Sequence, residues 1–273
     1  MKVGFVGLGN QGGPIARRIA RSGYDLVACD INPQALSAFD EPGAARSADP
    51  IATAKQVDVL CVCVRMDKDL VALAGDGALF AALGKGGVFI VHSTVDPGLC
   101  QQLADTAKTH DVDLLDAGVS GGGPAALAGE LAIYVGGDKA AFERVRPLLE
   151  SYGKSTFHLG PVGRGMEAKL LNNLVSIANY GMSAAILDLG ERLNFDREQL
   201  RLALMTGSAQ GYALRVVPGL LRPEGAVAIR ELLSKDLDHA KMLAPGDDVA
   251  LAALVPAAQA LLARLSRAAT EGG

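Results

Sequence analysis

The stretch "KVGFVGLGNQGGPIARRI" (2–19) places a short apolar strand directly before a glycine-rich turn and a helix. Gly7, Gly9 and Gly12 have the spacing G-x-G-x-x-G. In this spacing the first glycine permits a tight turn, the second lets a pyrophosphate approach the backbone, and the third lets the helix pack on the strand. The helix N-terminus then offers N–H groups to phosphate. We therefore predict a dinucleotide-binding loop, with an ordinary strand–turn–helix as the alternative.

An acidic residue, Asp30, stands at the end of the second predicted strand. A carboxylate at this position accepts hydrogen bonds from the adenosine ribose and repels a 2′-phosphate. The next residues are Ile31, Asn32 and Pro33, so no arginine follows to receive such a phosphate. We predict NAD as the cofactor, with NADP as the alternative.

Short apolar runs alternate with helical stretches through the first half of the chain. Continuous apolar strands are expected when helices cover both faces of a sheet, and the alternation gives right-handed parallel crossovers. After about residue 165 only helical periodicity remains. We predict a parallel, doubly wound α/β domain in residues 1–162 and an all-helical domain in residues 163–273. The predicted strands are 2–6, 25–29, 57–64, 87–91, 112–117, 131–136 and 155–159, and the later helices are 164–194, 196–206, 224–244 and 248–268.

Composition excludes several classes of protein. The net charge is −4 without a basic block, and aromatic residues make up only 4%, which argues against nucleic acid and anionic membranes as partners. We see neither a signal peptide nor an apolar run of membrane-spanning length uninterrupted by charge, so we expect a cytoplasmic protein. The four cysteines are expected in or near the core, and the four scattered histidines give no reason to predict a metal.

A second glycine-rich stretch, "DAGVSGGG" (116–123), also follows a predicted strand. The Ser120 hydroxyl and the N–H groups of Gly121, Gly122 and Gly123 are suited to bind a carboxylate, because strand ends are where open α/β sheets bind ligands. The alternative is a flexible turn. Ser93 and Thr94 follow another strand and offer hydroxyls at the same edge, although such hydroxyls are also common helix caps.

Polar residues interrupt the apolar helix that begins near residue 164. Lys169 and Asn173 are four residues apart and share a helical face, which continues through Ser176 and Tyr180. A lysine in a desolvated cleft can exchange protons near neutral pH, while an asparagine beside it holds the lysine or a substrate in register. The alternative is a lysine that extends to the surface at a domain edge.

The order of five motifs is distinctive: "VGFVGLGNQGGPIA", "HSTVDPG", "DAGVSGG", "GPVGRGMEAKLLNN" and "LLSKDLDHA". Together they resemble the β-hydroxyacid dehydrogenase family over nearly the whole chain. Its members include 3-hydroxyisobutyrate dehydrogenases, tartronate semialdehyde reductases and, more distantly, 6-phosphogluconate dehydrogenases. The resemblance implies a Rossmann domain, a long interdomain helix and a helical domain that assists dimer formation. It also implies NAD(P)-linked oxidation of a small β-hydroxyacid, or reduction of the corresponding semialdehyde, by a homodimer or homotetramer.

The same resemblance assigns roles to particular residues. It makes Lys169 the general acid/base and Asn173 its substrate-orienting partner, while Ser120, Gly121 and Gly122 hold the substrate carboxylate. Lys235 would close the site from the helical domain, with Asp236 supporting that closing loop. The predicted cofactor contacts are Gly7, Leu8, Gly9, Asn10, Gln11, Gly12, Asp30, Ile31, Arg65, Met66, Thr94 and Lys235.

Departures from the family pattern leave alternatives open. Gly118 and Arg65 stand where relatives commonly have prolines, which predicts a looser serine loop and leaves the contacts on the adenosine side open. The C-terminal region is also short for the family. The alternatives are an imine reductase of the same architecture, which Lys169 argues against, and a non-catalytic dinucleotide-binding module. The module would leave Ser120, Lys169, Asn173 and Lys235 without a purpose.

Overall fold

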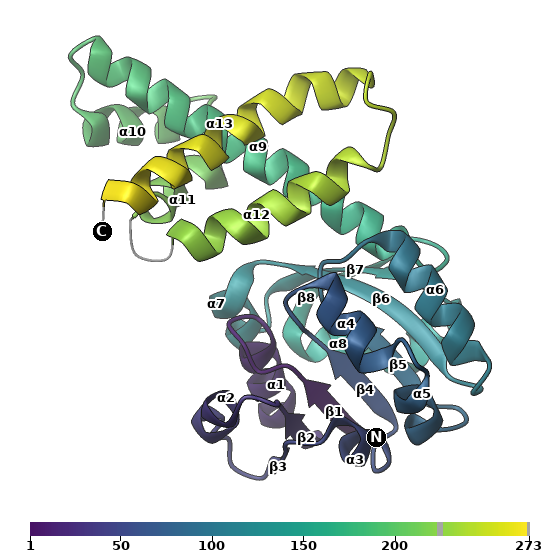
Figure 1. The fold of residues 1–273 in the computed structure, drawn as a ribbon. Coiled ribbons are helices and arrows are strands. Elements are labelled where there is room, and N and C mark those ends of the chain that lie inside the picture. Colours follow the sequence, from purple (N-terminus) through teal and green to yellow (C-terminus); the bar gives the residue numbers. More distant parts are fainter. Residues whose placement is uncertain (223–225, 272–273) are drawn as a thin grey trace. The chain divides into compact units, whose positions relative to one another are not determined.

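The computed structural model describes residues 1–222 and 226–271, and for residues 270 and 271 only the backbone. The chain forms two compact units, Met1–Lys169 and Leu170–Gly273. The first is α/β and the second is helical (Figure 1). The boundary between them falls inside the long helix α9 (Arg164–Arg192) rather than before it. The α/β and all-helical fold class predicted from the sequence is therefore confirmed.

A single sheet organises the first unit. In the described part of the chain its strand order is β3-β2-β1-β4-β5-β6-β7-β8. The strands from β1 to β6 are parallel, whereas β7 runs antiparallel to β6 and parallel to β8. The order of the first six is that of a Rossmann fold. The strands are β1 (Lys2–Val6), β2 (Asp25–Cys29), β3 (Ala45–Ser47), β4 (Val59–Val62), β5 (Val88–Val91), β6 (Asp113–Ser120), β7 (Leu131–Gly136) and β8 (Gly153–His158).

Two features of the sheet differ from the prediction. The sequence suggested a parallel sheet throughout, and this is wrong for β7 and β8, because an apolar run fits either strand direction. The edge strand β3 was not predicted. It has three residues, none of them buried, so it carries no apolar signal.

Helices cover both faces of this sheet (Figure 1). One cluster of buried residues joins the sheet to α1, α7 and α8, and another joins its opposite face to α3, α4, α5 and α6. Alternate residues of one strand enter different clusters, as Leu114 and Leu115 do. This explains the continuous apolar runs. The helices are α1 (Gly12–Arg21), α2 (Pro33–Ala38), α3 (Pro50–Ala54), α4 (Asp67–Ala74), α5 (Ala78–Leu83), α6 (Pro97–Lys108), α7 (Gly122–Ala128) and α8 (Lys139–Tyr152).

Several of these helices begin at a side-chain cap that directly precedes them. Asn32, Asp49, Asp96 and Asp138 accept hydrogen bonds from backbone N–H groups in the first turns of α2, α3, α6 and α8. Such caps satisfy N–H groups that have no acceptor within the helix. The start of each helix is thus set by its own local sequence.

The second unit consists of the remainder of α9 with four further helices in the described residues. They are α10 (Arg197–Thr206), α11 (Tyr212–Leu220), α12 (Ala226–Lys241) and α13 (Val249–Glu271). Its core joins Leu170 and Ile177 of α9 to Leu261 and Leu265 of α13. The helix α11, which contains Pro218, was not predicted. The first residues of the predicted helix 224–244 lie outside the described residues.

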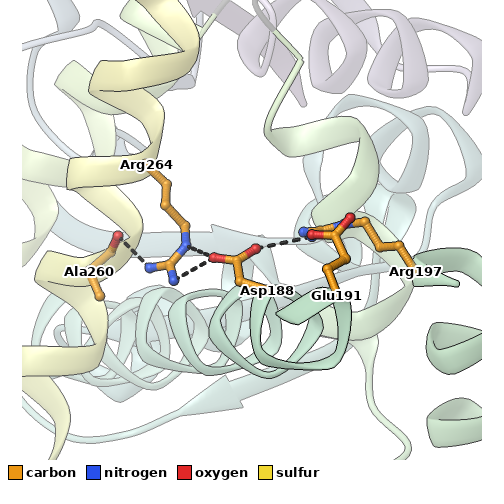
Figure 2. Close-up of polar contacts among 5 residues, drawn as sticks. All are labelled: Asp188, Glu191, Arg197, Ala260 and Arg264. Atoms are coloured by element: carbon orange, nitrogen blue, oxygen red, sulfur yellow. Dashed lines mark hydrogen bonds and ion pairs between the residues drawn. The ribbon is translucent and has the colours of Figure 1, made fainter. Parts of the chain in front are cut away.

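A charged network ties three helices of this unit together (Figure 2). Asp188 of α9 accepts hydrogen bonds from Arg264 of α13, at 2.7 and 2.9 Å, and from Arg197 of α10, at 3.0 Å. Arg197 also donates to Glu191, and Arg264 to the Ala260 carbonyl. Burial acts to raise the pKa of Asp188, but the two arginines outweigh it and hold this pKa below its ordinary value.

Two helices, α9 and the part of α13 from Val249 to Ala269, are long and apolar enough to cross a bilayer by length and composition. Both helices were predicted from the sequence, but neither was predicted to span a membrane. Core helices of helical bundles meet the same criteria, and these two pack on each other through the core of the second unit. Length and composition are therefore only weak evidence for a membrane span here.

Candidate active site

The three motif glycines of the first loop have different surroundings. Gly7 has a φ of +95°, and a Cβ there would collide with the Cys63 carbonyl. A Cβ at Gly12 would collide with the Gly7 carbonyl, whereas one at Gly9 would meet nothing within 4 Å. Gly7 and Gly12 therefore fold the loop, and Gly9 leaves open space in front of it.

The Asp30 carboxylate fastens this loop to the end of β2. It accepts a hydrogen bond from Leu8 N at 2.7 Å through Oδ2 and from Asn32 N at 2.8 Å through Oδ1. Beside it lies a cavity of about 560 Å³. The cavity is lined by Leu8, Gly9, Asn10, Gly13, Pro14, Arg17, Asn32, Gln34, Ala35, Ala38 and Phe39.

The loop fits the pyrophosphate of a dinucleotide. Helix α1 begins at Gly12 without a side-chain cap, so no carboxylate or hydroxyl of the chain binds its N-terminus, although Gly13 N donates to the Gly9 carbonyl at 2.9 Å and Pro14 has no N–H. The Gln11 Nε2 is buried and has no hydrogen-bond partner. With the open space at Gly9, these donors suit an anionic ligand.

Other predicted cofactor residues lie at the ends of the neighbouring strands β4 and β5. Arg65 and Met66 follow β4. Met66 is the N-cap of α4, and its backbone N donates to Asp69 Oδ2 at 3.0 Å. Thr94 follows β5, and its neighbour Ser93 accepts a hydrogen bond from Val64 N at 2.8 Å. Ser93 therefore links the two strand ends. The predicted contact residue Ile31 follows β2 and is 79% exposed.

The second glycine-rich stretch meets the first. Gly118 and Ser120 lie in β6, Gly121 has a φ of +133°, and α7 begins at Gly122. A Cβ at Gly123 would lie 3.0 Å from the Asn10 carbonyl oxygen of the first loop. The structure thus brings the predicted carboxylate site and the predicted pyrophosphate site to the same edge of the sheet.

Lys169 belongs to this same edge. Asp116, Gly118 and Ser120 alternate along β6 and share one face of the strand. A Cβ at Gly118 would lie 2.6 Å from Lys169 Cβ, so the stem of the lysine rests directly on this glycine. Gly118 is therefore part of a paired strand, rather than of the looser loop that the departure from the family pattern had suggested.

A buried histidine, which sequence reasoning passed over, lies behind the site. The His92 Nδ1 donates to the Ala117 carbonyl at 2.8 Å, and the Tyr152 hydroxyl donates to its Nε2 at 3.1 Å. The carbonyl can only accept, which sets the direction of both bonds. Burial lowers the pKa of His92 to about 4. The signal in the sequence was a histidine at the end of a continuous apolar strand.

The remaining predicted residues lie in the second unit. The Asn173 Nδ2 donates to Asp236 Oδ2 at 2.7 Å, and Lys235 Nζ lies 3.5 Å from Asp236 Oδ1. Lys235 and Asp236 are inside α12, so the expectation that Asp236 supports a closing loop is wrong. Ser176 and Tyr180 line a separate cavity of about 390 Å³ within this unit. Among the described residues, no group of three His, Cys, Asp or Glu side chains lies together as metal ligands would.

The family of this chain is shown by its similarity to known proteins. Residues 2–160 match the NAD binding domain of 6-phosphogluconate dehydrogenase. The chain is 31% identical to the 3-hydroxyisobutyrate dehydrogenase of Pseudomonas aeruginosa, over 80% of this chain and 75% of that one. It is also 31% identical to the NAD-dependent L-serine dehydrogenase of that organism, over 88% and 84% of the two chains.

A solved structure has the same fold over nearly the whole length. The 3-hydroxyisobutyrate dehydrogenase of Mycobacterium tuberculosis, determined with L-serine, superposes with a TM-score of 0.80 at 25% identity. The match covers 98% of this chain and 94% of that one. The chain therefore belongs to the 6-phosphogluconate dehydrogenase superfamily, among the relatives of 3-hydroxyisobutyrate dehydrogenase, and is an NAD(P)-binding oxidoreductase.

Proposed function

We propose that this protein is an NAD-dependent dehydrogenase of a small β-hydroxyacid, with Lys169 as its general acid/base. The observation that carries the proposal is the face of β6, where the stem of Lys169 rests on Gly118 and Ser120 follows two residues later. The dinucleotide loop contacts the same stretch at Gly123. A proton acceptor, a carboxylate site and a cofactor loop at one sheet edge are what hydride transfer from a hydroxyacid requires.

The residues of the first loop hold the cofactor. The uncapped N-terminus of α1 and the Gln11 amide bind the pyrophosphate in the open space at Gly9, and Asp30 binds the adenosine ribose. When bound, NAD⁺ supplies the acceptor for the hydride that leaves the substrate carbon. The preference for NAD over NADP follows from the Asp30 carboxylate, which would repel a 2′-phosphate.

The proton is handled by Lys169. In oxidation its neutral amine accepts the proton of the substrate hydroxyl, and in reduction the protonated amine donates it to the carbonyl oxygen. The Ser120 hydroxyl and the N–H groups of Gly121 and Gly122 bind the substrate carboxylate and hold the substrate for this transfer.

Asn173 contributes an oriented amide. Its Nδ2 donates to Asp236 at 2.7 Å, and its Oδ1 accepts from Asn172 at 3.1 Å, so the plane of the amide is fixed. We assign the second N–H hydrogen of Nδ2 to a substrate oxygen. Lys235, beside the same Asp236, adds positive charge that suits an acidic substrate.

We also propose a homodimer or homotetramer. Along α9 in the second unit, exposed apolar side chains recur at the spacing of a packed helical face: Leu171, Val175, Met182, Ile186 and Leu189. Apolar surface of this kind marks an interaction site. Light scattering of the purified protein tests this directly, because a monomeric mass would contradict it.

The function is tested with a panel of short acids. NAD⁺ and NADP⁺ are each offered with 3-hydroxyisobutyrate, glycerate, threonate and L-serine, and a semialdehyde acid and a cyclic imine are offered with NADH and NADPH. We expect NAD⁺-linked oxidation of at least one hydroxyacid. Preferential reduction of the imine, or cofactor binding without turnover, would overturn the proposal.

The role of the lysine is tested by Lys169→Met, with Lys154→Met on the exposed part of β8 as the control. We expect kcat to fall by about 10²- to 10⁴-fold in Lys169→Met, the range for loss of a general acid/base. The NADH dissociation constant, measured by nucleotide fluorescence, should stay within a factor of about two to three, because the cofactor residues are untouched. Normal turnover in Lys169→Met would remove the lysine from the mechanism.

A further inference from the structure

We infer that Asp116 and Gly118 of β6 are positioning residues for Lys169, so that the strand determines where the amine lies. This rests on the proposed role of Lys169. The two residues reach α9 in different ways: the Asp116 carboxylate binds the start of the helix, and Gly118 receives the stem of the lysine.

Asp116 acts as the cap of α9. Its side chain is fully buried, with Oδ1 accepting from Gly163 N at 2.8 Å and Oδ2 from Met166 N at 2.6 Å. These N–H groups belong to the start of the helix, where no helical carbonyl can accept from them and where negative charge is favoured. Burial raises the pKa of Asp116, against the opposing effect of these two donors.

This cap differs from those of α2, α3, α6 and α8. Their caps directly precede them in the sequence, whereas the cap of α9 lies 47 residues before Gly163. Glycines permit the long-range contact. A Cβ at Gly165 would collide with the carbonyls of Tyr134 and Asp116, and one at Gly136 would lie 2.5 Å from Asp116 Oδ1. The start of α9 is thus held directly against the strands β6 and β7.

Lys169 follows Met166 by three residues and therefore shares its helical face. The turn that Asp116 fixes is the turn that carries the lysine. At Gly118, an added Cβ would lie 2.6 Å from Lys169 Cβ and 2.9 Å from its Cγ, both inside the normal contact distance. Asp116 therefore fixes where the lysine lies along β6, and Gly118 fixes how closely it approaches the strand and Ser120.

The first experiment compares Asp116→Asn with Asp138→Asn. Both remove a carboxylate cap in the first unit, but Asp138 caps α8, which carries none of the proposed site residues. The amide of Asp116→Asn keeps the shape of the side chain yet can accept only one of the two N–H groups. We expect kcat to fall by about 10- to 100-fold in Asp116→Asn, as for a catalytic group displaced by up to 1 Å. The Asp138→Asn enzyme should stay within about twofold of the wild type.

Two further readouts separate positioning from folding. The solvent deuterium isotope effect on kcat should rise in Asp116→Asn, because proton transfer through a displaced amine becomes slower relative to other steps. Without cofactor or substrate, amide hydrogen exchange at Gly163 to Lys169 should accelerate by at least about tenfold, while exchange in α8 stays unchanged.

The second experiment compares Gly118→Ala with Gly4→Ala. A Cβ at Gly4 in β1 would lie 2.6 Å from Leu60 Cδ1, which matches the distance at Gly118, although the near atom is the end of a side chain and belongs to none of the proposed site residues. We expect Gly118→Ala to lower kcat by about 100-fold, the cost of moving a catalytic group by roughly 1 Å. The NADH dissociation constant should not change, and Gly4→Ala should keep its kcat once the folded fraction is corrected for.

The outcomes distinguish this inference from the function on which it rests. Full activity of Lys169→Met would overturn the proposed function and the inference with it. If Lys169→Met is inactive but Asp116→Asn and Gly118→Ala keep the kcat and isotope effect of the wild type, the inference alone is wrong. Equal losses of kcat in Asp116→Asn and Asp138→Asn would likewise mean that Asp116 only stabilises the helix and does not position Lys169.

Discussion

Each of the two glycine-rich stretches of the first unit contains a glycine whose missing side chain leaves space, but the space differs in what it can hold. In the first, Gly9 faces open space beside a cavity of about 560 Å³, so the missing side chain leaves room for a ligand. In the second, Gly118 has the stem of Lys169 against its Cα, so the missing side chain leaves room for another part of the chain. We propose that one glycine admits the cofactor and that the other admits the residue that acts beside it.

The atoms around a glycine, more than its place in a motif, therefore indicate its role. Gly7 and Gly12 keep their place in the motif because the backbone folds back on itself there. No such crowding requires a glycine at Gly9, and we propose that its missing side chain matters for the bound cofactor. Substitutions at these positions should therefore separate folding, cofactor binding and turnover.

The largest effect is expected at Gly7. Alanine there combines a φ of +95° with a collision against the Cys63 carbonyl, and we expect a loss of about 4 kcal/mol in unfolding free energy. The control Gly23→Ala has a φ of +88° but no neighbour within 4 Å, and should lose only about 1 kcal/mol. Urea unfolding measures both. Equal losses would mean that conformation alone, without crowding, shapes the first loop.

The next effect concerns the strands that lead into both stretches. His92 stacks on Phe5 of β1 at 6.0 Å between ring centroids and donates to the Ala117 carbonyl of β6. Its pKa is about 4 in the folded protein and about 6.5 when unfolded. Between these values the unfolded chain binds a proton that the folded chain does not. Unfolding free energy should therefore fall as the pH drops from about 6.5 to 4, by at most about 3 kcal/mol from this group.

This pH dependence is measured by urea unfolding at several pH values for the wild type and His92→Gln. Glutamine cannot take up the proton, so its unfolding free energy should change less with pH over the same interval. Parallel curves for the two proteins would show that His92 is not the titrating group and that another group causes the change of unfolding free energy with pH.

Gly9→Ala should weaken NADH binding, whereas Gly118→Ala should lower kcat and leave NADH binding unchanged. A methyl group at Gly9 meets no protein atom within 4 Å, so the melting temperature should not change. It occupies the space assigned to the pyrophosphate, and we expect NADH binding to weaken by about 30-fold, equivalent to about 2 kcal/mol. Nucleotide fluorescence gives the dissociation constant. Unchanged NADH binding in Gly9→Ala would erase the distinction between the two glycines.

The smallest effect concerns the choice of dinucleotide. Asp30→Asn keeps an acceptor for one backbone N–H but removes the charge that opposes a 2′-phosphate. We expect the ratio of kcat/KM for NAD⁺ over NADP⁺ to fall by about tenfold, equivalent to about 1.4 kcal/mol. The matched change Asp40→Asn, close in sequence but outside these two contacts, should leave the ratio as it is. A ratio that does not move in Asp30→Asn would locate the preference elsewhere.

The contrast between the glycines also explains what the sequence could reveal. The first loop was predictable because strand, turn and helix are contiguous, and the continuous apolar runs of β1, β2, β4 and β5 signalled a sheet covered on both faces. The reversed direction of β7 and β8 was not predictable, since burial does not depend on strand direction. The strand β3 is too short and exposed to leave a pattern.

Within the candidate site the limit was sequence distance. Lys169 and Asn173 were identifiable as polar residues within an apolar helical pattern. The dependence of α9 on Asp116 was not, because the two hydrogen bonds join residues about fifty positions apart. Gly118 was noticed only because relatives commonly have a proline there, and the contact that explains it is with Lys169, about fifty positions later.

Arg17 gives one practical consequence for anyone who wishes to redesign the coenzyme specificity of this scaffold. This arginine lines the cavity beside the first loop, but its guanidinium stacks over Phe39 and donates to the carbonyls of Ala38 and Asp40. Glu41 adds an ion pair at 3.5 Å. Replacing Asp30 alone would remove a repulsion without supplying an attraction. A variant that takes up a phosphorylated ribose needs a second change that releases this arginine.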